Sequence, residues 1–455
     1  MKKLFYRFIL CAAVCGLLCA LAGCKPVSSV PASTPPASST AAGDTDYSAY
    51  KTVYTGEGSY GGTAAGAYRL VYRADGSSNI TYIDYATRSE IYLCNRPNCT
   101  HDNESCTSWL PMDGISKDVF AAGDHLVILY HGSASAVDEF GPASMPHIDI
   151  ANLDGSERKT LITLDAACEM NLPILSDGNS LVFLTTVVQQ TGNVVSSANQ
   201  LVRIPFDEGK LQVLYDFSAY APQGEDLIGS PWFLLGADAK GFLIKNIAVS
   251  VPVEPGQTGI VSESQLHIIY RLSAQNGSTV MEELLNYPGG AYDEYLYDNS
   301  LYQLNLSETN LSLFRLDLMT GKKELLTDQL PTGNNDTVHF VGAYDGKLLL
   351  DSYLESSDGL TVTPVRVMVD LDTHEVKPCT LTYQEGEQER PVWIFAESKD
   401  AYLVVFGCEP YTEAVKGKLG DVRNVQRVRD IYGLIDKQDY WNSVPNYKPL
   451  TPLSS

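Results

Sequence analysis

The feature that most constrains the fold is a repeated phrase, a small polar turn of Asp, Asn or Gly followed by a short run of large apolar residues. The first apolar residue after each turn recurs at intervals of 55, 61, 59, 47 and 54 residues. These positions are Leu126, Leu181, Phe242, Leu301, Leu348 and Tyr402. Self-similarity at such a period is typical of repeat proteins, in which each unit buries its apolar side only against its neighbours.

A second phrase, a strand followed by a polar turn and another strand, lies between successive copies of the first. Three of its turns contain Asp-Gly, Asn-Gly or Thr-Gly, and glycine adopts the positive φ that tight hairpins require. The copies span 148–164, 201–217, 268–285, 313–326, 365–381 and 431–444. The two phrases together supply four antiparallel strands, and a propeller blade needs about 40–50 residues for four strands.

Six such units, with further strands in 68–94, predict an all-β chain that forms a single β-propeller of about seven blades, six to eight being compatible. A pair of β-sandwiches is also built from short strands, but it does not predict evenly spaced copies of the same phrases. The pattern resembles TolB-like propellers over nearly all of the folded region, especially in the turn Asn152-Leu153-Asp154-Gly155-Ser156. This resemblance implies a fold and no particular function.

The N-terminal residues predict an export signal. Lys2, Lys3 and Arg7 precede an apolar run at 8–21, which is shorter than the roughly 20 residues of a membrane span. The run ends in Leu21-Ala22-Gly23-Cys24, which resembles the lipobox of bacterial lipoproteins. The resemblance implies that a diacylglycerol is attached to Cys24 and that the chain is cut just before it. We therefore expect a lipid-anchored protein of the cell membrane that faces the extracytoplasmic side.

These features predict three segments: a signal peptide at 1–23, a lipidated Cys24 with a disordered Pro/Ser/Thr/Ala linker at 24–46, and a propeller domain at 47–455. The full chain has a formal charge of −23, and without Lys2, Lys3 and Arg7 the remainder carries −26. Such a charge disfavours nucleic acid as a partner and anionic lipid as a direct binding surface. Membrane attachment is therefore expected to depend on the lipid.

A cysteine- and histidine-rich segment, Cys-x4-Cys-x-His-x4-Cys, is formed by Cys94, Cys99, His101 and Cys106. It resembles a feature of uncharacterised lipoproteins from Gram-positive bacteria that share this propeller pattern. Three interpretations remain open. The four residues can hold a tetrahedral Zn²⁺, although the spacing departs from the usual Cys-x2-Cys. Two cysteines can instead pair locally while the third reaches Cys168, Cys379 or Cys408, which an oxidising compartment favours. The segment can also be a plain reduced loop.

No catalytic motif is present: G-x-S-x-G, H-E-x-x-H, a phosphate-binding loop and a calcium loop are all missing from the sequence. We therefore expect a non-enzymatic module that binds or scaffolds an unknown protein, peptide or glycan, with no cofactor other than Zn²⁺ at the cysteine cluster. The alternative is an extracellular hydrolase or lyase acting on a polymer with carboxylates in the central channel. A basic segment within 409–430 is a candidate partner-binding loop, formed by Lys416, Lys418, Arg423, Arg427 and Arg429.

Overall fold

The structure is a computed structural model of the whole chain. It describes residues 46–56, 61–191, 194–219, 227–228, 231–250, 265–275, 278–289, 292–306, 311–330, 338–355, 362–416 and 422–453. Cys24, Lys418 and the predicted signal peptide and linker up to residue 45 lie outside the described residues. No described helix is long and apolar enough to cross a membrane.

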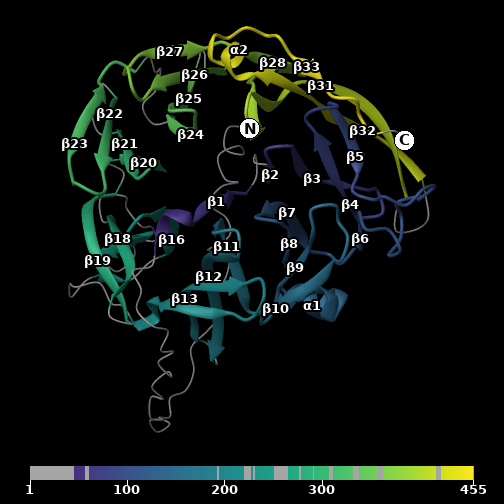
Figure 1. Cartoon of the computed structure of the whole chain (residues 1–455), viewed down its shortest axis with the longest axis horizontal. Helices are drawn as coiled ribbons and strands as arrows, with labels where there is room; N and C mark the ends of the chain where they lie inside the picture. Colours follow the sequence, from purple (N-terminus) through teal and green to yellow (C-terminus); the bar gives the residue numbers. More distant parts are fainter. Residues whose placement is uncertain are drawn as a thin grey trace, which may run out of the picture. The chain divides into compact units, whose positions relative to one another are not determined.

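Seven antiparallel sheets follow one another around a ring and form a seven-bladed β-propeller, so the predicted fold class and blade number are confirmed (Figure 1). We number the blades in chain order. The first four are β2 (Gly62–Thr63), β3 (Gly66–Tyr72), β4 (Ser78–Asp84) and β5 (Ser89–Tyr92), with β6 (Trp109–Leu110) on β4; β7 (Ser116–Ala122), β8 (His125–His131), β9 (His147–Asn152) and β10 (Lys159–Thr163); β11 (Cys168–Ser176), β12 (Ser180–Thr191), β13 (Val194–Pro205) and β14 (Gln212–Asp216); and β16 (Trp232–Asp238), β17 (Gly241–Ser250), β18 (Gln265–Gln275) and β19 (Ser278–Pro288), with β15 (Leu227–Ile228) on β17.

The remaining blades are β20 (Tyr292–Tyr297), β21 (Ser300–Asn305), β22 (Ser312–Asp317) and β23 (Lys323–Thr327); β24 (His339–Tyr344), β25 (Lys347–Glu355), β26 (Val362–Asp370) and β27 (Val376–Cys379); and β30 (Trp393–Glu397), β31 (Ala401–Lys416), β32 (Val422–Asp436) and β33 (Lys448–Pro449). A hairpin of β28 (Thr382–Glu385) and β29 (Gln388–Pro391) separates blades 6 and 7. The short helices are η1 (Tyr47–Ala49), α1 (Ala134–Phe140), η2 (Pro142–Ser144), η3 (Phe217–Ala219) and α2 (Lys437–Trp441).

The first sequence phrase forms the turn between the first and second strands of a blade. In blade 3, the Asp177 carboxylate accepts hydrogen bonds from the Asn179 and Ser180 N–H groups at 2.9 and 2.7 Å. Gly178 adopts φ +85°, the left-handed region that glycine occupies without strain. A Cβ on Gly123, in the corresponding turn of blade 2, would lie 2.4 Å from the Gly178 carbonyl oxygen. These turns therefore pack directly against one another on one side of the ring.

The apolar strands are buried on both faces, each face against a different neighbouring blade. In β12, Leu181 and Phe183 pack into the core between blades 2 and 3, whereas Val182 and Leu184 pack towards blade 4. Leu181, Val182 and Phe183 are each 0% exposed. Because side chains alternate along a strand, one continuous apolar run can fill two inter-blade cores.

The ring has no strand shared between its first and last blades in the described part of the chain. Ala67 and Ile83 of blade 1 instead pack against Leu403 and Leu434 of blade 7. Near this core, a parallel bridge joins Ser89 to Thr451. The Glu90 N–H donates to the Thr451 carbonyl at 3.1 Å, and the Thr451 N–H donates to the Arg88 carbonyl at 2.8 Å.

The centre of the ring contains β1 (Lys51–Tyr54), which the sequence analysis did not anticipate (Figure 1). It pairs antiparallel with β11, the innermost strand of blade 3. The Tyr54 ring stacks on Phe120 of blade 2 with centroids 5.2 Å apart, and its hydroxyl donates to Asp118 at 2.7 Å. In η1, Tyr47 packs edge-on against Phe242 of blade 4. The N-terminal segment therefore contacts three blades.

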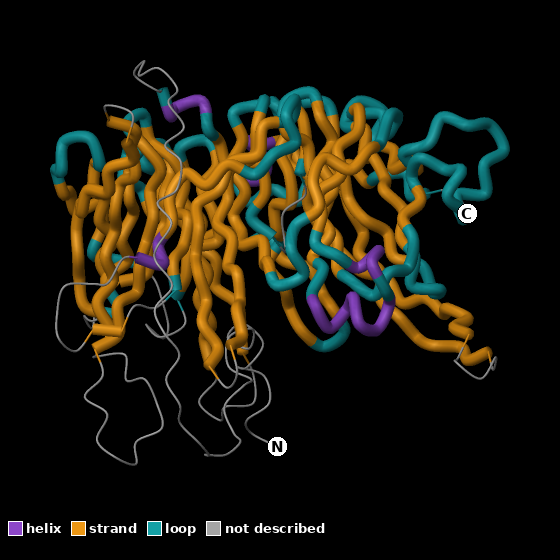
Figure 2. The backbone as a smooth tube through the Cα atoms, turned by 90° about the horizontal axis from the view of Figure 1, so that it is seen from below, coloured by secondary structure: helices purple, strands orange, loops and turns teal. Residues whose placement is uncertain are grey.

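The second and third strands are the longest in several blades, and they continue beyond one side of the ring (Figure 2). We call this the hairpin side; it carries the connections between β12 and β13, β17 and β18, β25 and β26, and β31 and β32. The opposite side, which carries the turns between first and second strands, is called the turn side. The longest described strands, such as β31 and β32, thus extend towards the hairpin side.

Removal of one inter-blade side chain tests this packing. We expect Leu181→Ala to lower the free energy of unfolding by about 2–5 kcal/mol, because the lost methyl groups leave a cavity between blades 2 and 3. The matched control is Val213→Ala on the outer strand β14, where the side chain is 49% exposed and the change stays within about 0.5 kcal/mol. Urea unfolding followed by tryptophan fluorescence measures both; equal effects would contradict the proposed core.

Candidate metal centre and neighbouring sites

The cysteine–histidine segment is an excursion from the outer edge of blade 1. The Leu93 N–H donates to the Ile80 carbonyl at 3.0 Å, and the Ile80 N–H donates to the Ser108 carbonyl at 2.8 Å. The chain therefore leaves the outer strand after Leu93 and rejoins it at Ser108, opposite the same residue of β4. The outer strand consists of β5 and β6, separated by this loop.

The four predicted ligands are brought together in this loop. The sulfur atoms of Cys94, Cys99 and Cys106 and a ring nitrogen of His101 all lie within 4.8 Å of one another. His101 Nδ1 is 3.3 Å from Cys106 Sγ. Zinc ligands at 2.0–2.3 Å in a tetrahedron are separated by about 3.5–3.8 Å, so the cluster needs little adjustment to enclose Zn²⁺. Among the described residues, it is the one group of three or more Cys, His, Asp or Glu side chains so arranged.

The six cysteines predicted to remain after export are all described, and all are free thiols. Cys94, Cys99 and Cys106 therefore share a cluster without a disulfide bond, and none of them is joined to Cys168, Cys379 or Cys408. The cluster is therefore capable of binding a metal ion, and which of the three interpretations holds stays a prediction.

The pKa values of Cys94 and Cys106, the first and last cysteines of the cluster, are shifted in opposite directions. Burial opposes ionisation of Cys94, but hydrogen bonds from the Arg96 N–H and from neighbouring side chains outweigh it and lower the pKa of this thiol. Burial raises the pKa of Cys106 to about 11, and the neighbouring thiols Cys94 and Cys99 add to the shift. Burial also lowers the pKa of His101, with a further contribution from the charge of Arg73. A neutral imidazole beside a readily ionised thiol suits metal ligation, since bound Cys and His must be deprotonated.

Surrounding groups fix the orientation of His101. Its ring stacks on Tyr92 with centroids 4.3 Å apart, and its backbone has φ +56°. Its carbonyl oxygen accepts hydrogen bonds from Asn79 Nδ2 at 2.9 Å and from Arg73 Nη1 at 3.3 Å. Such outer contacts set the direction of a ligand ring before a metal binds.

The loop also connects blade 1 to blade 2. Arg158 of blade 2 donates from Nη1 to the Trp109 carbonyl at 3.2 Å, and Thr107 Oγ1 donates to the Leu93 carbonyl at 2.7 Å. The Tyr68 hydroxyl of blade 1 donates to the Leu153 carbonyl of blade 2 at 2.8 Å. The cluster thus lies where an inserted loop, its own blade and the next blade meet.

The predicted basic loop is a strand-paired arm. Lys416 is the last residue of β31 and pairs with Val422, Arg423 pairs with Val415, and Arg427 pairs with Tyr411. Arg429 Nε is 2.6 Å from Glu409 Oε1 across the two strands. The charge of Arg429 is therefore partly neutralised within the arm. The order of residues in the sequence did not reveal this ion pair.

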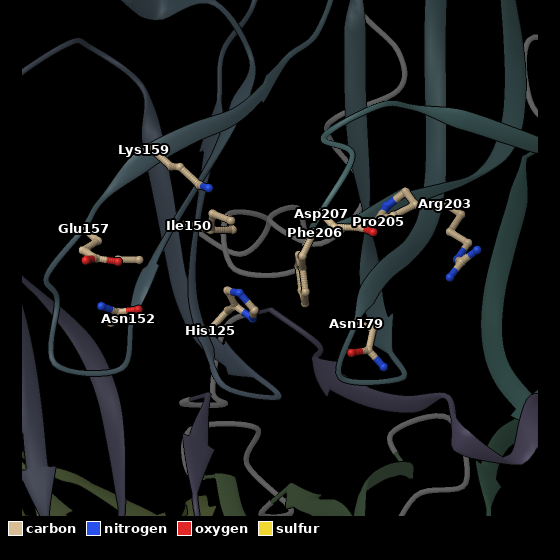
Figure 3. A pocket seen from close by; sticks show the side chains of 11 residues that line it. His125, Ile150, Asn152, Glu157, Lys159, Asn179, Arg203, Pro205, Phe206 and Asp207 are labelled. Carbon is tan, nitrogen blue, oxygen red and sulfur yellow. The ribbon is translucent and has the colours of Figure 1, made fainter.

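A cavity of about 640 Å³ opens on the turn side between blades 2 and 3 (Figure 3). Its apolar floor includes Ile150 and Phe206, which are 3% and 7% exposed. Its charged lining comes from both blades: Glu157 and Lys159 from blade 2, Arg203 and Asp207 from blade 3. Sequence analysis missed this cavity because its walls are more than forty residues apart in the chain.

A histidine–aspartate pair was also missed. His131 Nε2 lies 2.6 Å from Asp118 Oδ2, whereas Asp118 Oδ1 accepts the hydrogen bond from Tyr54. The sequence places His131 thirteen residues from Asp118, and only the antiparallel pairing of β7 with β8 brings them together. Through the hydrogen bond from Tyr54 to Asp118, this pair connects the central strand β1 to blade 2.

No family model matches the chain, and no curated protein matches it in sequence. Similar solved structures include the oligogalacturonate lyase of Vibrio parahaemolyticus, with 10% identity and a TM-score of 0.44 over 78% of this chain and 93% of that one. An oligogalacturonate lyase in complex with manganese gives 12% and 0.45 over 86% and 92%. TolB from Acinetobacter baumannii gives 14% and 0.31 over 84% and 77%. At these values the likenesses say nothing of activity or ligand.

The thiol state has a direct test. After denaturation without reductant and in the presence of a chelator, we expect alkylation to modify all six cysteines from Cys94 to Cys408 in the mature chain, because none is in a disulfide. Intact mass spectrometry counts the added groups. A count of four or two would show that one or two disulfides form, and a matched sample with reductant gives the full count.

Proposed function

We propose that the chain is a lipid-anchored, extracytoplasmic β-propeller that acts as a non-enzymatic binding or scaffold module, with Zn²⁺ held by Cys94, Cys99, His101 and Cys106. One observation carries the binding role: β1 of the chain itself lies at the centre of the ring, whereas the polar loop 94–107 leaves the outer edge of blade 1 and the paired strands β31 and β32 extend beyond one side of the ring. Recognition by projecting loops on a rigid scaffold needs no catalytic group in the channel.

The zinc supports an otherwise weakly stabilised loop. The excursion from 94 to 107 has one fully buried apolar contact, Cys106 at 1% exposed, and most of its other residues are exposed or half-buried. Such a loop gains little from the hydrophobic effect to offset its ordering entropy. Four bonds between the metal and its ligands supply that stabilisation. They keep the loop in the position in which Arg158 contacts its C-terminal end.

Membrane attachment is tested with Cys24→Ala in the full precursor. Loss of the only thiol in the lipobox removes the acyl anchor, and we expect the protein to move from the membrane fraction to the soluble or secreted fraction. Cys19→Ala, a second cysteine of the leader, is the matched control and stays membrane-bound. Retention of Cys24→Ala in the membrane fraction would refute lipid anchoring.

Metal binding is tested with the detergent-solubilised mature chain. We expect native mass spectrometry to show one zinc per chain, and Cys99→Ser to lower zinc affinity at least about tenfold because it removes one of four ligands. At free zinc of a hundred times Kd, binding adds about 2.7 kcal/mol of stability, so the chelated protein unfolds at a lower temperature.

The matched control is Cys408→Ser, a half-buried thiol on β31 whose sulfur contacts the Gln384 carbonyl at 3.2 Å, outside the cluster. It retains the zinc. Equal zinc content in both variants, or no zinc in the unmodified protein after reconstitution, would refute the metal centre while leaving the anchoring proposal untouched.

A further inference from the structure

The cavity on the turn side combines an apolar floor with charges of both signs. The Phe206 ring lies against His125 in a tilted arrangement with ring centroids 4.6 Å apart, and Pro205 continues the apolar surface. Glu157 and Lys159 stand on one wall and Arg203 and Asp207 on the other (Figure 3). At about 640 Å³ the cavity falls within the range of roughly 300–1,000 Å³ seen for ligand pockets.

The charged groups around the cavity are mostly not used by the protein itself. No ion pair or hydrogen bond joins the side chains of Glu157, Lys159 or Asp207 to another residue in the described part of the chain. Lys159 in particular is not paired with Glu157, although both line the same wall. Arg203 differs, because its Nε donates to Ser180 Oγ at 3.0 Å and its Nη2 lies 3.8 Å from Asp177. Arg203 is thereby held in place beside the cavity.

The floor of the cavity also contains a buried ring nitrogen. His125 Nδ1 is shielded from solvent and has no hydrogen-bond partner among the described residues. Buried polar atoms are almost always hydrogen-bonded in folded proteins, so this nitrogen is suited to accept or donate a hydrogen bond to a polar group of a ligand in the cavity. The amides of Asn152 and Asn179 offer further hydrogen bonds at the rim.

We propose that this cavity binds a short zwitterionic peptide that spans its two walls, with its carboxylate held by Lys159 on one wall and its ammonium group held by Asp207 on the other. A polyanion would be repelled by the two carboxylates and a polycation by the two bases, whereas a ligand carrying one charge of each sign satisfies both. The apolar floor accommodates small side chains, and the volume allows several residues rather than one. This inference names a ligand class for the proposed binding role and rests on it.

The test uses three probes on the mature chain: trialanine, N-acetyl-trialanine and trialanine amide. Isothermal titration calorimetry should show that trialanine binds and that each capped peptide binds about tenfold or more weakly, because a charge-assisted hydrogen bond is lost. Lys159→Gln should weaken trialanine binding and abolish the discrimination against the amide. Asp207→Asn should weaken trialanine binding and abolish the discrimination against the acetylated peptide.

The control is Lys240→Gln, which removes an exposed lysine from a turn of blade 4 on the same side of the ring. It leaves affinity and discrimination unchanged. Three probes that bind alike, no binding at millimolar peptide, or equal effects of Lys159→Gln and Lys240→Gln would each overturn the inference. Zinc content, measured on the same preparation, tests the metal centre of the proposed function. Fractionation of Cys24→Ala, measured separately, tests its anchor. Both readouts are distinct from peptide binding.

Discussion

The packing of each blade against its two neighbours is the interaction on which the rest of the structure depends. Leu181 and Val182 are adjacent in β12, yet they fill different cores, and Leu348 and Leu349 do the same in β25. A single blade would leave one or both of these surfaces in water, so no unit is stable alone. The ring must therefore close, and the core of Ala67 with Leu403 closes it without a shared strand. Because this packing stabilises the fold, the fold does not need disulfide bonds for its stability.

The central strand changes what the ring can do. β1 occupies the inner edge of β11, and Tyr54 joins it to blade 2 through Phe120 and Asp118. An edge that would otherwise line an open channel is thus hydrogen-bonded by the chain itself. Because β1 follows the predicted linker directly, a lipid anchor on Cys24 would pull on a segment that three blades hold together. Attachment near the axis would distribute a pulling force over several blades. Attachment at an outer strand would instead pull that strand away from a single blade.

The repeat was predictable because it is a local pattern. Polar turns and apolar runs recur within each unit, and six such units with further strands in 68–94 imply about seven blades, six to eight being compatible. The cysteine–histidine cluster was also visible, since Cys94 and Cys106 lie in one short segment, but the sequence could not choose between metal and disulfides. That choice depends on where the sulfur atoms lie. The pairing of Arg429 with Glu409 depends on strand register, and the walls of the cavity, Lys159 and Arg203, meet only through the packing of two blades. Neither relation has a sequence signal.

The same division explains where recognition can evolve in this protein. Residues that point between blades are fixed, because each contributes to two packed units and a change in volume is felt on both sides. Residues in the outer loop from Cys94 to Cys106 and at the rim of the turn-side cavity contact little of that core. Their side chains can change at small cost to the ring. A metal in the loop would extend this principle: four ligands would replace a hydrophobic core as the source of local order, and the surface of the loop would remain polar and free to bind.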